Sequence, residues 1–533
     1  MIKSLLRSQL AYRVKESIIN SKYIFIYRRE NTLEKITILK NITFFKIKKN
    51  NSDSKNILVQ QLDSYELTLK IASAVKAYSM FDSIKVYCYE PKFNKKLNWI
   101  NKDEQMYFLF FKTFTQRVYK ALGYNFLFDL DQKFSNRIKI EKKFKEISGL
   151  IRTKDDVLKI TIDNILVGDL IYDTYLRFYG NHTVSNINDQ NLKDVIYYAI
   201  DNYYLVEKYI EQKSISALFT SYTTYINHGL AVRICLNKNI PIYTFGSNSY
   251  FIQRLDTNYP YHIQKYWNFS NLELSEKQKN EVERELNFRF SGGIDSAISY
   301  MKTTSFAPRS NKNNYFHEKR ERNVVVYVHD IYDSPHGVKK LLFTDFYSYI
   351  VELSEQIRFD ETTQYFFKFH PNAIGDSNQK ITDYLLSLQS DAISLLPLEV
   401  SNLDVVAFNP DLIVTVNGTV GVEMAYFQIP VVALIDNLYM NFSFVHSCYS
   451  LQEYLNVIKG IVKVNVNFDL LEIYSFYYQA YKKELEGIDK SILEILSIQH
   501  DTSSDNYLKK VNENFNFSLF EKLILLLQSK FNK

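Results

Sequence analysis

The sequence predicts an α/β protein with two successive parallel sheets covered by helices. From residue 56, apolar runs of strand length alternate with amphipathic segments of helix length, and this rhythm starts again at residue 323. The chain of 533 residues is also too long for one ordinary core. We expect four parts, namely an N-terminal extension, two α/β lobes and C-terminal helices, over residues 1–55, 56–300, 301–480 and 481–533.

The first lobe has apolar strand patterns separated by helical ones. Strands are predicted at 57–62, 83–90, 215–220 and 241–245, and helices at 64–81 and 225–236. A charged helix over residues 271–289 is expected to connect the lobes, and the polar stretch over 307–322 is expected to form a loop.

The second lobe repeats this pattern more regularly. Strands are predicted at 323–330, 364–370, 392–397 and 412–416 and after Pro430, and helices at 343–356 and 376–388. The segments richest in polar residues follow these strands. Because ligands bind at the carboxyl ends of strands in open α/β sheets, we expect the site in this lobe.

Composition narrows the possible classes of function. A hydrophobic content of 46% is ordinary for a globular protein, and a net charge of +6 is too weak to argue for a nucleic-acid partner. Cys88, Cys235 and Cys448 form no CxxC pair, which argues against a disulfide framework or a zinc site. No run of about 18 apolar residues is present. A cytoplasmic protein is expected, with membrane contact that is at most peripheral.

The segment from Asp411 to Leu434 is the most informative of the chain. It combines a buried strand, a polar turn (Asn417, Gly418 and Thr419), a helix opening near Gly421 and a second strand. Backbone N–H groups at such a turn have no internal partner and favour an anion. Glu423, in the first helical turn, is expected to accept hydrogen bonds from ribose or sugar hydroxyls.

A second group follows the strand at 364–370. His370 lies at the strand end, where its imidazole can donate to a phosphate, and Lys368 adds positive charge nearby. Pro371 stops the strand and directs the loop. The alternative is a histidine that caps a turn without any ligand.

A third group follows the strand at 323–330. It brings together His329, Asp330, Asp333, Ser334 and His336. Carboxylates at a strand end can act as a general base or nucleophile, or bind a divalent cation. Asp-Ser-Pro-His-Gly is equally good turn chemistry, so both interpretations stay open.

The segment Ser291–Ala297, SGGIDSA, matches the pyrophosphate-binding loop of ATP pyrophosphatases. That loop requires a preceding hydrophobic strand, whereas the residues before it here have the pattern of a charged helix. We therefore expect a turn between helices, in which Gly292 and Gly293 serve backbone flexibility.

Polar residues of the first lobe form a weaker candidate acceptor site. Tyrosine rings offer flat faces to sugars, and arginines bind carboxylates or phosphates. The candidates are Asp169, Asp173, Arg177, Tyr222, Tyr225, His228 and Arg233. The C-terminal segment over 516–533 has the pattern of an amphipathic helix, either on a membrane surface or packed on a domain, and we favour packing.

The second lobe resembles the nucleotide-sugar lobe of GT-B glycosyltransferases. The resemblance rests on a strand ending in Lys-x-His-Pro, a strand followed by a polar turn and a Gly-x-Glu helix, and a Pro-Val-Val strand, over about residues 320–450. It is nearest to bacterial capsule and surface-polysaccharide proteins, including Kdo transferases, and sialyltransferases share the His-Pro element. This implies two Rossmann-like lobes with helical N- and C-terminal extensions.

The resemblance also implies roles for individual residues. His370 would contact the nucleotide phosphate, Thr415, Asn417 and Thr419 would line it, and Glu423 would hold the ribose or sugar. Kdo-type relatives carry Gln-x-x-x-Asp after the first strand of this lobe. Here His329 stands in place of the Gln, and Asp333 in place of the catalytic Asp, with Asp330 as the second choice for base or nucleophile.

The implied function is glycosyl transfer from a CMP- or UDP-linked sugar to a growing capsular or lipid-linked saccharide. No cofactor or metal is expected, because His370 and the 417–423 loop would take the place of a metal. The alternatives are an enzyme similar to UDP-sugar 2-epimerases and a non-catalytic scaffold of polysaccharide assembly.

Overall fold

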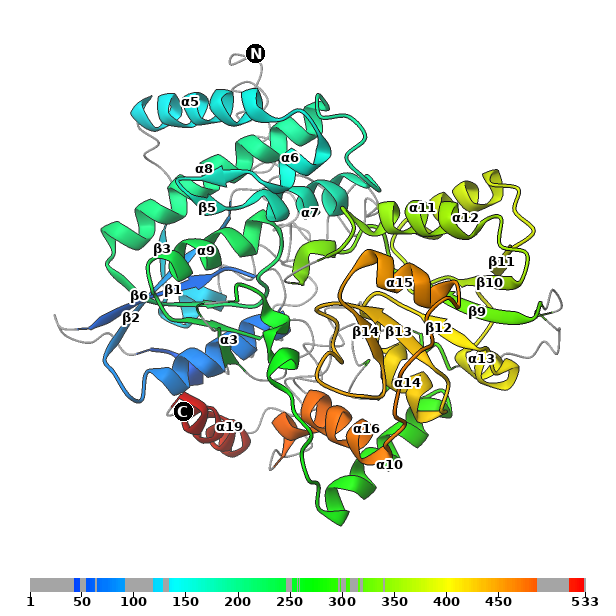
Figure 1. Ribbon diagram of the computed structural model, residues 1–533. Coiled ribbons are helices and arrows are strands. Elements are labelled where there is room, and N and C mark those ends of the chain that lie inside the picture. Colours follow the sequence, from blue (N-terminus) through cyan, green and yellow to red (C-terminus); the bar gives the residue numbers. More distant parts are fainter. Residues whose placement is uncertain are drawn as a thin grey trace, which may run out of the picture.

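The computed structural model contains two α/β lobes that lie side by side, the first mainly in blue to cyan-green and the second mainly in green to orange (Figure 1). The structure describes residues 43–47, 54–62, 65–91, 118–127, 134–245, 252–255, 257, 259–295, 298, 303–306, 315–316, 320–338, 341–486 and 517–531. The expected N-terminal extension lies outside these residues, except for 43–47 and 54–55.

The first lobe is built on a six-stranded sheet. Its strands are β1 (Lys55–Gln60), β2 (Ile84–Tyr89), β3 (Asn125–Leu127), β6 (Ile215–Thr220), β7 (Ile242–Thr244) and β8 (Gln253–Arg254). They are ordered β3-β2-β1-β6-β7-β8, and only β8 is antiparallel to its neighbour. A separate antiparallel pair joins β4 (Thr161–Ile162) to β5 (Ile165–Leu166).

Helices cover both faces of this sheet. One face packs α3 (Tyr65–Tyr78) with the C-terminal helix α19 (Phe517–Phe531). The other face packs α5 (Phe134–Leu150), α6 (Lys154–Leu158), α7 (Gly168–Tyr179), α8 (Gln190–Gln212) and α9 (Tyr225–Asn237). Two 3-10 helices are also described here. η1 (Thr43–Phe45) precedes β1, and η2 (His262–Asn268) lies in the segment that leads to the second lobe.

The second lobe has an entirely parallel six-stranded sheet. Its strands are β9 (Arg322–Tyr327), β10 (Thr363–Lys368), β11 (Ile393–Leu396), β12 (Leu412–Val414), β13 (Val431–Leu434) and β14 (His446–Cys448). The order is β11-β10-β9-β12-β13-β14, with each pair parallel. Counted along the chain, both sheets therefore have the 3-2-1-4-5-6 order of a Rossmann fold.

Helices also cover both faces of the second sheet. One face carries α11 (Phe346–Ile357), α12 (Ser377–Ser387) and α15 (Leu451–Ile458). The other carries α10 (Glu276–Phe290), α13 (Asn402–Phe408), α14 (Val420–Tyr426), α16 (Leu470–Tyr477) and the π-helical η5 (Tyr478–Lys482). The 3-10 turns η4 (Pro335–Gly337) and η6 (Lys483–Leu485) lie at the interlobe seam and after η5.

The central strand β9 shows why the sequence forms this sheet. Val324 and Val326 pack into the core on the side of α11, and Val325 packs into the core on the side of α14. All three are fully buried. A strand buried on both faces requires a continuous apolar run, and this is the pattern from which the strand was predicted.

The predicted fold class, two Rossmann-like lobes in a GT-B architecture, is confirmed. The change of lobe, however, comes earlier in the chain than the expected position at residue 300. Leu255 packs in the core of the first lobe, whereas Tyr266 and Leu286 of the linker and α10 pack in the core of the second. The charged connecting helix thus exists, and its few apolar residues assign it to the second lobe.

The lobes touch through α7 and the loop that follows it. In the first lobe, Tyr172 and Thr183 both donate hydrogen bonds to Asp345 Oδ2, at the amino end of α11, over 2.5 and 2.6 Å. Asp173 Oδ1 lies 2.6 Å from His336 Nδ1 of η4. Figure 1 shows α7 beside α11 at this seam.

The C-terminal helix α19 lies against α3 of the first lobe, below the sheet in Figure 1. Its Leu523, Ile524 and Leu527 are buried there. The predicted packing role for this helix is confirmed, because its apolar face is covered by the domain. No helix among the described residues is both long enough and apolar enough to cross a membrane.

Candidate active site between the lobes

The crossover of the second sheet lies between β9 and β12. In Rossmann-like sheets the ligand crevice opens beyond the carboxyl ends of the strands at this point. His329 follows β9, and its Nε2 lies 3.4 Å from Thr415 Oγ1 and 3.5 Å from Asn417 N, both after β12. The two sequence segments singled out for chemistry therefore meet at the expected position.

His370 follows β10, the neighbour of β9 on its other side. The expectation that His370 and the loop beyond Val416 lie at the same end of the sheet is confirmed, because β10, β9 and β12 are consecutive parallel strands. His370 Nδ1 accepts a hydrogen bond from the Asn372 N–H over 3.2 Å. A neutral ring therefore carries its proton on Nε2, which serves as a donor.

The histidines of this crevice are neutral at pH 7. Burial lowers the pKa of His329 to about 4, and the nearby His370 lowers it further, against the opposing charge of Asp333. Burial also lowers the pKa of His370. These imidazoles act as hydrogen-bonding groups and not as fixed cations.

Asp333 is an exposed residue of the loop after β9. Its Oδ1 accepts a hydrogen bond from its own neighbour, the Ser334 N–H, over 2.9 Å. Its charge contributes to the pKa values of groups from both lobes, namely His329 and His370 of the second lobe and Arg177, Tyr225 and His262 of the first. Asp333 is thus an exposed carboxylate whose charge is felt by groups of both lobes.

Asp330 has a different environment. It is buried, and its Oδ1 and Oδ2 accept hydrogen bonds from the N–H groups of Tyr332 (2.9 Å) and Ile374 (2.8 Å). Burial raises its pKa above the ordinary value. Asp330 ties the loop after β9 to the loop after β10 and so fixes the crevice wall.

Thr415 and Lys368 also brace this wall. Thr415 is fully buried, and its Oγ1 accepts a hydrogen bond from the Gly418 N–H over 3.2 Å. Lys368 is buried, and its Nζ donates to the Val400 carbonyl over 2.8 Å. Pro371 follows His370 directly and begins a turn, as expected.

Glu423 lies behind the crevice. It is buried, and its carboxylate accepts hydrogen bonds from Arg289, from Asn402 Nδ2 (2.9 Å) and from Thr419 Oγ1 (3.2 Å). Thr419 shares this network, so both side chains face inward in this structure. The expected contact of Glu423 with ribose or sugar stays a prediction.

The segment after α10 does not have the geometry of a pyrophosphate loop. The charged helix α10 runs directly into Ser291, and no described strand feeds the glycines, as the sequence predicts. Asp295 is buried and forms an ion pair with Arg289 over 3.1 Å.

The crossover of the first sheet, between β1 and β6, contributes a second polar wall. Thr220 Oγ1 donates to Gln60 Oε1 over 2.8 Å, and Gln60 Nε2 lies 2.8 Å from His228 Nδ1. The Tyr222 ring packs against the rings of His228 and His262, with centroids 5.5 and 5.7 Å apart. Burial lowers the pKa of both histidines to about 4.

Arg177 and Tyr225 are two residues of the first lobe on which the charge of Asp333 acts. Tyr225 has a φ of 59°, a left-handed conformation that costs a residue with a side chain about 1–3 kcal/mol. It hydrogen-bonds Ser334 of the other lobe. Burial acts to lower the pKa of Arg177, but the negative charges of its neighbours, Asp333 included, hold it above the ordinary value.

The other acceptor candidates have partners within the protein. Asp169 and Arg233 form a buried ion pair, and Arg233 Nη1 donates to the Leu166 carbonyl over 3.0 Å. Asp173 is engaged by His336 across the seam, and burial raises its pKa to about 6. Of the seven candidates, Arg177, Tyr222, Tyr225 and His228 therefore form the group that stands together near the crevice.

Sequence inspection missed several residues around the site. His262 lies on η2, where no strand end marks it, and its Nδ1 is 3.0 Å from Thr223 Oγ1. Arg289 and Asn402 reach the site from helices distant in the sequence. The one sequence feature that could have pointed to Arg289 is its place as a basic residue in the last turn of α10. Charged helices on protein surfaces have the same feature, so it does not identify a site.

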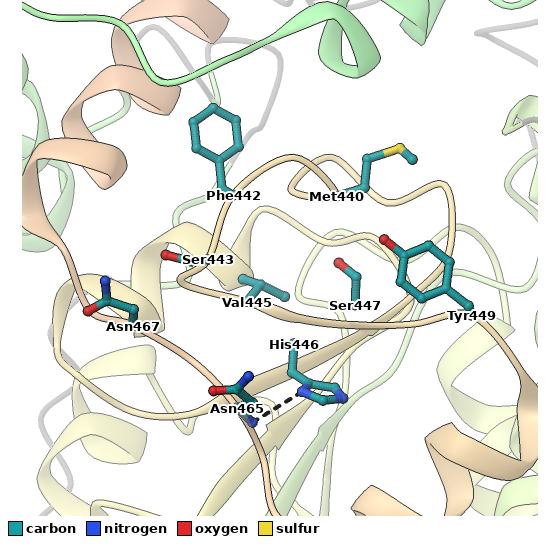
Figure 2. Close-up of a pocket in the computed structure, with 9 residues that line it drawn as sticks. All are labelled: Met440, Phe442, Ser443, Val445, His446, Ser447, Tyr449, Asn465 and Asn467. Atoms are coloured by element: carbon teal, nitrogen blue, oxygen red, sulfur yellow. Dashed lines mark hydrogen bonds between the residues drawn. The ribbon is translucent and has the colours of Figure 1, made fainter.

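A cavity of about 280 Å³ lies outside this crevice, along the edge strand β14 (Figure 2). His446 lines this cavity, and its ring offers a ligand atom within 4.8 Å of those of Cys448 and Glu453. However, His446 Nδ1 accepts the Asn465 N–H over 3.1 Å, the dashed line in Figure 2. A neutral ring then carries its proton on Nε2, where a metal would have to bind, so the arrangement does not favour a metal.

No family model and no curated protein matches the chain. Solved structures with similar folds include a beta Kdo 2,4 transferase of Thermosulfurimonas dismutans (13% identity, 50% of this chain and 79% of that one, TM-score 0.31). A glycosyltransferase from Rickettsia africae is 8% identical over 90% of this chain and 100% of that one, with a TM-score of 0.26.

A UDP-GlcNAc 2-epimerase of Methanocaldococcus jannaschii is 10% identical over 79% of this chain and 97% of that one, with a TM-score of 0.26. At such identities and TM-scores, similarity supports no conclusion about the activity of this chain. Function has to be argued from its own residues.

Proposed function

We propose that the protein is a glycosyltransferase that moves a sugar from a nucleotide-sugar donor to a saccharide or lipid-linked acceptor. The observation that carries the proposal is the position of Asp333. Its exposed carboxylate lies next to Ser334, which hydrogen-bonds Tyr225 of the first lobe, and its charge acts on Arg177 and His262 of that lobe. A base between a donor lobe and an acceptor lobe is what transfer to a hydroxyl requires.

The step can be written with these groups. Asp333 takes the proton of an acceptor hydroxyl while the acceptor oxygen bonds to the anomeric carbon of the donor sugar. The bond between that carbon and the phosphate oxygen breaks, and the oxygen leaves with the electron pair. Its negative charge is met by the Nε2–H of His370, whose ring is held by the Asn372 N–H, and by polar groups of the loop that begins at Asn417, whose backbone N–H is directed to His329.

The neutral histidines suit a hydroxyl-rich ligand, since they exchange hydrogen bonds without adding charge. We infer a CMP- or UDP-linked donor and a growing capsular or surface saccharide as acceptor. On this proposal the enzyme works in the cytoplasm, possesses no metal cofactor and associates at most peripherally with the membrane. These finer assignments rest on the resemblance of the Lys-x-His-Pro and Gly-x-Glu segments to surface-polysaccharide transferases.

The test has two stages. Thermal-shift measurements with CMP, UDP, GDP and CDP should show one nucleotide that raises the melting temperature, because a ligand that binds only the folded state stabilises it. His370→Asn should weaken that shift, whereas His446→Asn, a matched change on the edge strand, should keep it. Candidate donors of that nucleotide are then assayed with and without saccharide acceptors.

The outcomes separate the alternatives. A glycosylated product that forms only with acceptor supports the proposal. An epimerised sugar or free nucleotide from donor alone would indicate epimerase chemistry, and a folded protein with no nucleotide affinity would indicate a scaffold. Either of the last two results overturns the transferase assignment.

A further inference from the structure

A buried cluster of charges lies directly behind the loop after β12, residues 415–419. The guanidinium of Arg289 forms an ion pair with Glu423 and donates through Nη1 to Asp295 Oδ1 over 3.1 Å. The three residues are 3–4% exposed. Arg289 lies at the end of α10 and Asp295 follows it in the SGGIDSA segment, whereas Glu423 belongs to α14, so the cluster ties one stretch of the chain to a helix 134 residues further on.

A second layer of hydrogen bonds closes the cluster. Tyr477 of α16 donates to Asp295 Oδ2. Asn402 donates to Glu423 Oε2 over 2.9 Å, and its Oδ1 accepts from Tyr327, the last residue of β9, over 3.1 Å. Every carboxylate oxygen of Glu423 and Asp295 therefore has a partner.

The cluster is unusual in its charge. One guanidinium is shared between two buried carboxylates, and burying an ion costs several kcal/mol unless it is well paired. Burial acts to lower the pKa of Arg289, but Glu423 and Asp295 more than offset this and hold it above the ordinary value. Such a cluster is weak evidence for stability, so a role in specifying one local geometry has to be considered.

The loop after β12 is the part of the site that the cluster touches. Arg289 Nη2 lies 3.4 Å from Thr419 Oγ1, and Thr419 also donates to Glu423. Gly418 is held from both directions, since its carbonyl accepts from Tyr439 (2.9 Å) and its N–H donates to Thr415 (3.2 Å). These contacts leave little freedom to the loop that presents Asn417 next to His329.

We propose that Arg289 and Asp295 are positioning residues that fix the 415–419 loop for the phosphate-bearing part of the nucleotide. The SGGIDSA segment thereby has a role that is not pyrophosphate binding: its aspartate orients the guanidinium, and the guanidinium orients Thr419 and Glu423. The inference rests on the proposed function, because it assumes a nucleotide at this loop.

Conservative variants of the full-length protein test this inference. Arg289→Lys keeps the charge but loses the fork that reaches Asp295, Thr419 and Glu423 together. Asp295→Asn keeps the size of the side chain and a hydrogen-bonding oxygen. The control is Arg322→Lys at the opposite end of β9, where Arg322 donates to the carbonyls of Val457 (3.1 Å) and Ile458.

The readouts are the Kd of the nucleotide that stabilises the wild-type protein, measured well below the melting temperature, and the melting temperature itself. We expect both cluster variants to bind that nucleotide about tenfold or more weakly while they remain folded, since small displacements of a binding loop are costly. Arg322→Lys should lower the melting temperature and leave the Kd unchanged.

Two results would overturn the inference in distinguishable ways. If both variants bind the nucleotide as tightly as wild type, the cluster only stabilises the lobe and the proposed function stands. If Arg289→Lys does not fold, wild-type binding by Asp295→Asn alone leads to the same conclusion. If wild type binds none of CMP, UDP, GDP and CDP, the proposed function fails and the inference fails with it.

Discussion

At Gly421, the hydrogen in place of a side chain decides how closely α14 can approach Tyr439. A Cβ atom at this position would lie 2.3 Å from Tyr439 Cε2, far inside van der Waals contact. The same tyrosine donates a hydrogen bond to the Gly418 carbonyl, so the close approach helps to hold the 415–419 loop. The glycine expected to open an anion-binding helix is therefore required by packing.

Gly421→Ala should destabilise the second lobe by about 1–3 kcal/mol, because an overpacked core must shift. The matched control is Gly149→Ala in α5, where an added Cβ meets nothing within 4 Å. There the substitution should be neutral or stabilising by about 0.5–1 kcal/mol. Urea unfolding measures both, and equal stability of the two variants would contradict the packing argument.

Three histidines near the crevice predict a stability that falls in mild acid. Burial lowers the pKa values of His228, His262 and His329 to about 4. Between pH 6.5 and 4 the unfolded chain takes up protons that the folded protein does not, so stability is complete above pH 6.5 and is lost as the pH falls. Each histidine contributes a slope of at most about 1.4 kcal/mol per pH unit.

His228→Asn should therefore flatten the pH dependence of the unfolding free energy between pH 7 and 5 by roughly one proton. Urea denaturation of both proteins at pH 7, 6 and 5 gives the two slopes, with the urea m-value as a check that the same surface unfolds. Identical slopes for wild type and variant would show that His228 does not stay neutral in the folded state.

At the scale of elements, helix α19 packs with the first lobe, although among the described elements it is the last in sequence. Leu527 is 2% exposed against that lobe, whereas Leu525, two residues before it, is 57% exposed. Burying a leucine side chain removes apolar surface from water and fills space that nothing else fills.

Leu527→Ala should cost about 2–4 kcal/mol of unfolding free energy, by analogy with other buried leucines. Leu525→Ala on the same helix should stay within about 0.5 kcal/mol of wild type. Calorimetry or urea unfolding compares the pair. A large loss at Leu525 with none at Leu527 would mean that the helix packs through its other face.

The elements that sequence patterns identified share a physical property. Strands such as β6 and β9 are apolar on both sides and lie between turn-forming residues, so their burial can be inferred from composition alone. β3 and β14 escaped, because each has three residues and begins with a polar one, Asn125 or His446, whereas the equally short β7 and β12 begin with an isoleucine or a leucine. The helices α5 and α8 escaped as well. α5 is rich in charged residues and has no clear apolar face, whereas α8 buries Val195, Ile196 and Ala199 on a face with helical spacing that the prediction did not use.

The candidate site, like the fold, was predicted in part from the sequence. His329, His370 and Asn417 could be placed together, because parallel strands deliver their carboxyl ends to one edge. The inward orientation of Glu423 could not be predicted. It depends on Arg289 and Asn402, and a pairing between distant helices leaves no local pattern in one sequence.

At the scale of the whole molecule, α7, η4 and α11 form a seam between the two lobes, and near it Tyr225, after β6, hydrogen-bonds Ser334, after β9. The seam is polar: Asp345 accepts from Tyr172 and Thr183, and Asp173 pairs with His336. Interfaces between domains of one chain are commonly polar and permit relative motion. Asp333 lies next to this seam, so its surroundings depend on how both lobes are placed.

The central claim is that Asp333 acts as the base between the lobes, and the transfer rate of Asp333→Asn tests it most directly. With the stabilising nucleotide sugar and a saccharide acceptor, we expect kcat to fall about 10²–10⁴-fold while donor affinity and melting temperature stay unchanged. Asp391→Asn, an exposed aspartate elsewhere on the same lobe, should retain full activity. Wild-type turnover by Asp333→Asn would contradict the account.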